Sequence, residues 1–118
     1  MERFVFTPES AFTPLQELLQ SVTIAPLTPP LSDTAAFQAA VFRVAPGGRI
    51  ARHAATVPQI LAVISGSGEV SGADGLGQAI AAGEAVFWSE GEEHETRTDA
   101  GLTALVLEGR GLVPFRRL

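Results

Sequence analysis

The feature that most constrains this chain is a series of short apolar runs, separated by glycine-containing turns, that begins at residue 35. The runs are rich in Val, Ile and Phe, and each is too short for a helix of ordinary length. Asp74-Gly75, inside one of the turns, is a dipeptide favoured in two-residue hairpins. Runs and turns in this order are typical of consecutive β-strands, so the sequence predicts an all-β domain over residues 35–118.

Two of these runs, ILAVI at 60–64 and ALVL at 104–107, are apolar at every position. A strand with one face in water would alternate apolar and polar residues, so we expect both faces of these two strands to be covered. The outer faces can be covered by the N-terminal arm, by a second sheet or by a second subunit. Because we do not expect the arm alone to cover them, we predict a homodimer.

One short helix is predicted near the N-terminus, over TPLQELLQ at residues 13–20. Thr13 suits the cap of such a helix, and Pro14 suits its first helical position. Gln16 stands three residues after the cap, where a Gln side chain can bond back to the backbone of the capping residue.

Residues 1–34 differ from the rest of the chain because they contain five of its eight prolines. The stretch PLTPPLSD at 26–33 is predicted to run extended, because proline fixes its own φ and disfavours the α conformation in the residue before it. We therefore divide the chain into an N-terminal arm with a short helix, residues 1–34, and the β-domain, residues 35–118.

The composition excludes several partners and several kinds of chemistry. The formal net charge is −5, and the basic residues, all of them Arg, form no dense stripe, which argues against nucleic acid and membrane surfaces as partners. The chain has no Cys and no Lys, so disulfides, thiolate nucleophiles, Cys-ligated zinc and lysine Schiff bases are excluded. No apolar run reaches the ~18 residues of a membrane span, and MERFVFTPES lacks the pattern of a secretory signal. We therefore expect a cytoplasmic protein.

The two histidines of the chain, His53 and His94, lie in segments that are predicted to be strands. Every second side chain of an extended strand points to the same face, so His53, Ala55 and Gln59 would share a face if the chain stayed extended between them. His94 follows a glycine turn, and its neighbour on the same face is Thr96.

The spacing around the first histidine resembles the first sequence motif of the cupin superfamily. That motif is a glycine, five residues, His, one residue, His, three or four residues, Glu, six residues and a second glycine. The corresponding positions of this chain hold Gly47, His53, Ala55, Gln59 and Gly66. Both glycines and the first His match the motif, whereas Ala and Gln replace the second His and the Glu.

The second histidine lies in a segment that resembles the second motif of the same family, which is a glycine, five residues, Pro, one residue, Gly, two residues, His, three residues and Asn. Those positions hold Gly83, Ser89, Gly91, His94 and Thr98. The resemblance covers roughly residues 38–110 and implies a jelly roll in which two sheets enclose one pocket. The predicted fold is therefore all-β, a cupin-type jelly-roll barrel with a short N-terminal helix and an extended arm.

The resemblance also implies a metal site in that pocket, with His53, Gln59 and His94 at three ligand positions and Ala55 in place of the fourth ligand. Two imidazoles and one amide lack the carboxylate that Fe(II), Mn(II) and Ni(II) sites commonly include. We therefore expect a divalent transition metal, Mn, Fe, Ni or Zn, to bind weakly. Besides Ala55, the side chains expected to line the pocket are Thr96, Phe42 and Trp88.

Four functions are compatible with this pattern. The favoured one is a small-molecule-binding cupin with a reduced metal site, in which the histidines are polar pocket residues and the partner is a small-molecule ligand. The alternative is a metal-dependent enzyme of the dioxygenase or isomerase type that uses the two-histidine site, because catalytic metals need open coordination positions. A metal-free enzyme with one His as general base and a structural dimer module with a filled pocket are the other two. The sequence leaves open whether the protein is an enzyme.

Overall fold

The structure is a computed structural model that describes residues 1–2, 5–14, 17–28 and 37–115. Apart from one 3-10 turn, η1 (Pro8–Ser10), the described residues form strands and their connections. The strands are β1 (Leu19–Pro26), β2 (Phe37–Ala54), β3 (Gln59–Ser71), β4 (Gln78–Ala81), β5 (Ala85–Trp88), β6 (Glu93–Arg97) and β7 (Leu102–Gly109). All the strand pairs are antiparallel. The all-β fold predicted from the sequence is confirmed.

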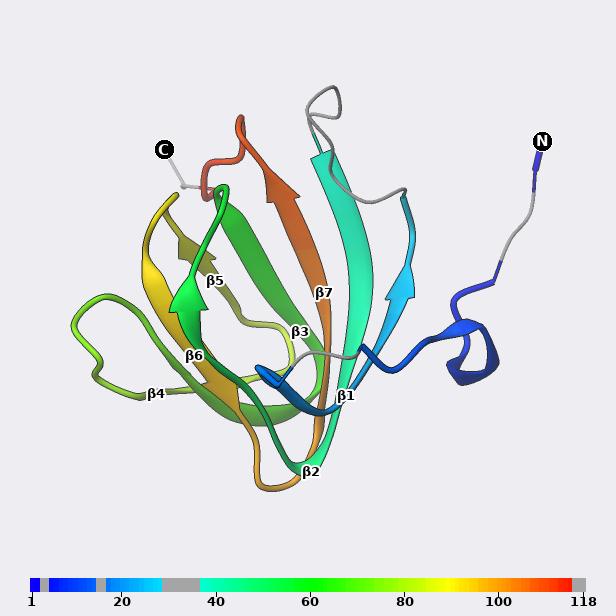
Figure 1. Cartoon of the computed structure of the whole chain (residues 1–118), viewed down its shortest axis with the longest axis horizontal. Helices are drawn as coiled ribbons and strands as arrows, with labels where there is room; N and C mark the ends of the chain where they lie inside the picture. The colour runs from blue at the N-terminus through cyan, green and yellow to red at the C-terminus, as the bar shows by residue number, and fades with distance from the viewer. Residues whose placement is uncertain (3–4, 15–16, 29–36, 116–118) are drawn as a thin grey trace.

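Four of the strands form a closed circuit that makes the barrel. The first half of β2 pairs with β7, and the second half pairs with β6. β3 likewise pairs first with β7 and then with β6. The circuit β2–β7–β3–β6 is therefore continuous, while β1 is added at β2, and β4 and β5 are added at β3. In Figure 1 these strands curve into a bowl, and β7 ends and β3 begins at its upper end.

The two long strands change partners close to glycines. Gly47 in β2 has φ 80° and Gly66 in β3 has φ 83°, values in the left-handed region that favours glycine. A Cβ atom at position 66 would also overlap the carbonyl oxygen of Gly101, in the turn between β6 and β7. Gly47 and Gly66 are the two glycines of the first motif, so the motif marks the points where both strands bend into the barrel.

The core of the barrel is filled by side chains that point inward at alternate strand positions. Leu61 and Val63 of β3 are 2% and 3% exposed, and Ala104 and Val106 of β7 are 0% and 4% exposed. The other members of this apolar cluster are Val22, Val44, Ile50, Val70, Ile80, Trp88 and Leu102.

The outer faces of β3 and β7 are only partly covered by the described residues. Ile60, Ala62, Leu105 and Leu107 are half-buried, and Ile64 is 61% exposed. The two wholly apolar runs therefore alternate in burial although they do not alternate in polarity. The homodimer that we expected to cover these faces stays a prediction.

The helix predicted over residues 13–20 is wrong. Glu17 and Leu18 form a turn and Leu19 begins β1, while residues 15–16 lie outside the described part of the chain. β1 pairs with β2 from its first residue to its last, so its backbone groups find partners in the sheet and Leu19 packs against the core. This tertiary pairing outweighs the local capping signals that favoured a helix.

The boundary predicted between residues 34 and 35 lies outside the described residues, as does most of the stretch 26–33. β1 pairs with β2, so the second half of the predicted arm contributes a strand to the barrel sheet. Leu27 and Thr28, which follow β1, donate backbone hydrogen bonds to the carbonyl oxygen of Ala39 in β2.

Val63→Asp should lower the free energy of unfolding by ~3 kcal/mol or more, because it places an unpaired carboxylate in the apolar interior. Chemical denaturation, followed by the fluorescence of Trp88, the one Trp of the chain, measures the change. Ile64→Asp is the matched control: its side chain is 61% exposed on the opposite face, and the substitution should cost less than ~1 kcal/mol. Equal losses in the two variants would contradict the inward direction of Val63.

Candidate functional site

A cavity of about 270 Å³ lies inside the barrel, beside the filled core. The N-terminal segment contributes Phe12 to its wall, and Phe12 is held there by a pair of backbone hydrogen bonds with Ile24 of β1. The cavity contains the three predicted ligand residues and three of the predicted lining residues, which are His53, Gln59, His94, Phe42, Trp88 and Thr96.

The two histidines face each other across neighbouring strands. His53 of β2 and His94 of β6 are direct partners in the antiparallel register, and their ring centroids are 4.4 Å apart. The other side of His94 stacks on Trp88 of β5, with a centroid distance of 4.3 Å. Trp88 and His94 are each 2% exposed, so the ring positions are fixed by packing.

Backbone carbonyls fix the tautomers of both imidazoles. His53 Nδ1 lies 2.7 Å from the carbonyl oxygen of Ala51, and His94 Nδ1 lies 3.0 Å from that of Glu92. Because a carbonyl only accepts hydrogen bonds, Nδ1 carries the hydrogen in each ring and Nε2 keeps its lone pair. Burial lowers the pKa of His94 below 6.5, although the Glu92 carbonyl opposes this effect, and the neighbouring His53 lowers the pKa further. The Nε2 atom of each imidazole is therefore the one left to accept a hydrogen bond from a ligand.

Glu108 is a functional residue that the sequence analysis missed. Gln59 of β3 and Glu108 of β7 are partners in register, and Gln59 Nε2 donates to Glu108 Oε1 at 2.6 Å. The signal that would have found Glu108 is the alternation along β7, because Leu102, Ala104 and Val106 point inward and the next inward position is 108. The cavity therefore contains a carboxylate.

The polar side chains of the cavity come from strand positions that are neighbours around the barrel. Gln38 of β2 is opposite Glu108, Glu108 is opposite Gln59, and Gln59 is opposite Trp88. Trp88 stacks on His94, and His94 faces His53, which brings the series back to β2. We call this series the polar rim; its six residues are Gln38, Glu108, Gln59, Trp88, His94 and His53.

Below the polar rim the cavity wall is apolar. The next inward-facing residue is Ala40 after Gln38 on β2, Leu61 after Gln59 on β3 and Val106 below Glu108 on β7. All three of these apolar residues line the cavity. Phe42 and Ile50 of β2 and Thr96 of β6 complete the lower wall. A ligand in this cavity would meet polar groups at the rim and apolar side chains at the floor.

Ala55 lies apart from the cavity wall that the structure describes, although alternation placed it there. β2 ends at Ala54, so the alternation of side chains stops before position 55. Ala55 is buried, its N–H donates to the carbonyl oxygen of Glu92, and its own carbonyl accepts from Gly91. Ala55 therefore holds the turn that leads into His94.

Glu92 has a structural role in the same turn. Its carboxylate accepts hydrogen bonds from the backbone N–H groups of Ser89 and Ala73, at 3.0 and 3.1 Å. These bonds tie the turn before β6 to the loop after β3. The carboxylate is therefore occupied by backbone groups, and Glu92 contacts His94 through its carbonyl, while the charge of the carboxylate raises the pKa of His94.

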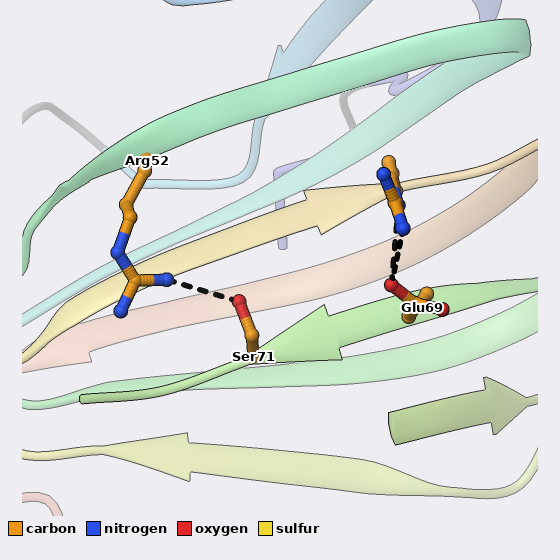
Figure 2. A network of polar contacts seen from close by, with 4 residues as sticks. Arg52, Glu69 and Ser71 are labelled. Atoms are coloured by element: carbon orange, nitrogen blue, oxygen red, sulfur yellow. Dashed lines mark hydrogen bonds and ion pairs between the residues drawn. The ribbon is translucent and has the colours of Figure 1, made fainter. Parts of the chain in front are cut away.

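Polar contacts on the outside of the barrel hold β6 between β2 and β3. Arg52 of β2 reaches past β6 and donates to Ser71 Oγ at 3.1 Å and to the carbonyl oxygen of Gly72 (Figure 2). Arg97 of β6 forms an ion pair with Glu69 of β3 at 2.7 Å. Exposed pairs of this kind contribute about 0–1 kcal/mol each. No Arg is among the described residues that line the cavity.

Solved structures with the same fold are found among cupins. The polyketide cyclase RemF from Streptomyces resistomycificus has a TM-score of 0.79 at 24% sequence identity, covering 100% of this chain and 85% of that protein. A cupin-2 domain protein from Rhodospirillum rubrum gives a TM-score of 0.71 at 18% identity, covering 97% and 78%. A predicted oxalate decarboxylase from Thermotoga maritima gives 0.64 at 25% identity, covering 75% and 79%. This chain has the fold of the cupin superfamily, as its motifs predicted.

No family profile matches the chain, and no curated protein matches its sequence. The likeness is therefore one of fold, and the function of the site has to be argued from the residues of this chain. Among the described residues, no helix is long and apolar enough to span a membrane.

The residues of this cavity do not fit the tightly held metal that the cupin fold often carries. The described residues contain no cluster of three His, Cys, Asp or Glu side chains arranged to hold a metal ion. His53 and His94 supply two nitrogen donors, Ala55 supplies none, and the carboxylate of Glu108 is bonded to Gln59. Two imidazoles alone are a weak donor set for a divalent ion.

The lowered pKa of His94 should make the folded protein less stable as the pH falls. The unfolded chain takes up a proton near pH 6.5 and folded His94 takes it up only at lower pH, so the unfolded state binds more protons in between. The free energy of unfolding should therefore fall as the pH drops from about 7.5 to about 5.5, and His94→Gln should reduce this slope. Urea denaturation of chelator-treated protein measures it. Glu90→Gln, at an exposed position whose charge is not among those that shift the pKa of His94, is the control. If His94→Gln keeps the slope of the wild type, the assignment of the slope to His94 is wrong.

Proposed function

We propose that this protein binds a small molecule in the barrel cavity and that its metal site is reduced to two histidines. The observation that carries the proposal is the cavity itself, in which a polar rim stands above an apolar floor. Ligand sites in proteins are typically concave and mostly apolar, with a few placed polar groups that fix orientation. A structural module without a ligand would fill this space with side chains.

The metal-dependent alternative has less support than the binding function. RemF is called a polyketide cyclase and the Thermotoga maritima protein a predicted oxalate decarboxylase, so the fold accommodates enzymes. The donor set of this chain, however, lacks the third imidazole, and among the described residues no carboxylate forms a metal-holding cluster with the two histidines. A divalent transition metal is therefore expected to bind weakly, and ligand binding does not depend on it.

A metal-free acid–base enzyme is the second candidate function. Glu108 favours it, because a carboxylate and two neutral imidazoles face one cavity and each can accept a proton. Groups that differ in their affinity for protons, held in one water-poor cavity, are the usual components of such catalysis. The homodimer and the cytoplasmic location expected from the sequence stay predictions.

Moving the carboxylate back to the motif position should strengthen metal binding. Gln59→Glu alone would place two carboxylates 2.6 Å apart, and their repulsion would leave one of them protonated. The exchange Gln59→Glu with Glu108→Gln keeps one carboxylate and one amide and moves the carboxylate to the motif position. The double variant should bind Zn²⁺ or Mn²⁺ at least ~10-fold more tightly than the wild type in calorimetric titration after chelator treatment.

The single variant Gln59→Glu, with Glu108 intact, is the matched control, and it should gain less affinity than the double variant. Tight stoichiometric binding to the wild type, lost in His53→Ala or His94→Ala, would show that the metal site is complete and that the reduced-site proposal is wrong.

Filling the floor of the cavity should abolish ligand binding. N-phenylnaphthylamine, an uncharged dye whose fluorescence rises in apolar surroundings, should bind the wild type saturably, and Ala40→Phe should remove this binding. Ala79→Phe, on the exposed position of β4, adds the same side chain outside the cavity and should leave binding unchanged. Gln38→Trp narrows the rim without changing the floor, and it should also weaken dye binding. It is the second test variant in case Ala40→Phe folds poorly. Full dye binding in folded variants of both kinds would place the dye outside the cavity and contradict the proposal.

A further inference from the structure

We infer that the ligand of this cavity is an uncharged ring compound with hydroxyl groups at two edges, and that Glu108 and the paired histidines receive those hydroxyls from opposite parts of the polar rim. This inference rests on the proposed binding function, and it adds the chemical class of the ligand.

Three residues of the polar rim, Glu108, His53 and His94, present hydrogen-bond acceptors, while the N–H donors outside the two imidazoles belong to Gln38, Gln59 and Trp88. His53 and His94 each use Nδ1–H for a backbone carbonyl, which leaves the Nε2 lone pair. Gln59 donates to one oxygen of Glu108, and the described residues give the carboxylate no other hydrogen bond. A bound ligand would bury these acceptors, and a buried acceptor without a hydrogen-bond donor costs free energy. A ligand that carries donor groups of its own is therefore favoured.

The charges around the cavity exclude an anionic ligand. No Arg lines the cavity within the described residues, and the chain has no Lys. Glu108 adds a negative charge to the rim, and a carboxylate or phosphate would lose its hydration there without gaining a cationic partner. The arginines nearest in the sheet, Arg52 and Arg97, are engaged on the outer face with Ser71 and Glu69.

The position of the acceptors favours hydroxyl groups over an amine. An ammonium group would pair with Glu108, but a single amine would leave the two imidazoles, on β2 and β6, without donors. One face of Trp88 is stacked by His94 and is therefore not free to receive a cation. Two hydroxyl groups on a rigid ring reach both sets of acceptors, while the ring itself packs against Phe42, Leu61 and Val106 at the floor.

The contact with Glu108 is what should make a hydroxylated ligand bind more tightly than a merely apolar ligand. A hydrogen bond from a hydroxyl to a carboxylate is roughly twice as strong as one to a neutral acceptor. Gln59 holds the carboxylate through its amide and thereby acts as a positioning residue. Glu108→Gln keeps the size of the side chain and a bond to Gln59, yet removes the charge.

Matched naphthalene probes test this inference by calorimetric titration in the presence of a chelator. Naphthalenediol should bind the wild type at least ~10-fold more tightly than naphthoate or naphthylmethylammonium, and more tightly than naphthol, which has a single hydroxyl. Glu108→Gln should weaken diol binding ~10-fold, and His53→Leu should bring the affinity for the diol down to that for naphthol. Glu90→Gln loses the same charge in the exposed turn before β6 and should change neither affinity.

Binding of N-phenylnaphthylamine, measured in every variant, separates this inference from the proposed function. If the wild type binds the dye but has equal affinities for the diol and naphthoate, the inference of a hydroxylated ligand is wrong while the binding function stands. The same holds if Glu108→Gln leaves the affinity for the diol unchanged. Tighter binding of naphthylmethylammonium than of the diol would overturn it in favour of an amine. If the wild type does not bind the dye at all, both the inferred ligand class and the proposed binding function are wrong. A folded Glu108→Gln variant is recognised by its retained dye binding, and His53→Leu provides the second test.

Discussion

The continuous circuit β2–β7–β3–β6 is the constraint on which the cavity and its rim depend. β2 and β3 each pair with both β7 and β6. Each strand can do so only because it bends close to a glycine in the left-handed region, Gly47 in β2 and Gly66 in β3. The bend in β2 brings its two ends to the same rim, with Gln38 at one end and His53 at the other. Without the bend, the histidine pair and the Glu108 pair would belong to separate surfaces.

The replacement of the motif glutamate by Gln59 is explained by its neighbour. Glu108 lies directly across the strand pair, and an amide beside it donates a hydrogen bond where a second carboxylate would repel it. The negative charge of the cavity is thus retained but stands one strand away from the motif position. The proposed ligand would therefore meet a carboxylate on β7 and imidazoles on β2 and β6.

The site was only partly predictable from local patterns. His53, Gln59 and His94 were placed in one pocket by motif spacing, and the structure brings them into one cavity. Ala55 was placed on the wall by alternation, but alternation ends where the strand ends, and β2 stops at Ala54. Glu108 was missed because no motif marks it and because ALVL was taken as a run covered on both faces, although the inward series along β7 continues to position 108.

The sequence by itself determined the class of fold, because strand periodicity and glycine turns are local properties, and the spacing of Gly47, Gly66, Gly83 and Gly91 is characteristic of one barrel. It also determined what the site lacks, since a chain without Cys or Lys excludes whole kinds of chemistry. Only the tertiary structure decided that residues 19–26 form a strand, because pairing with β2 satisfies their backbone better than an isolated short helix would. It alone assembled the polar rim, because hydrogen-bond partners such as Gln59 and Glu108 are far apart in the chain and meet only through the register of β3 and β7.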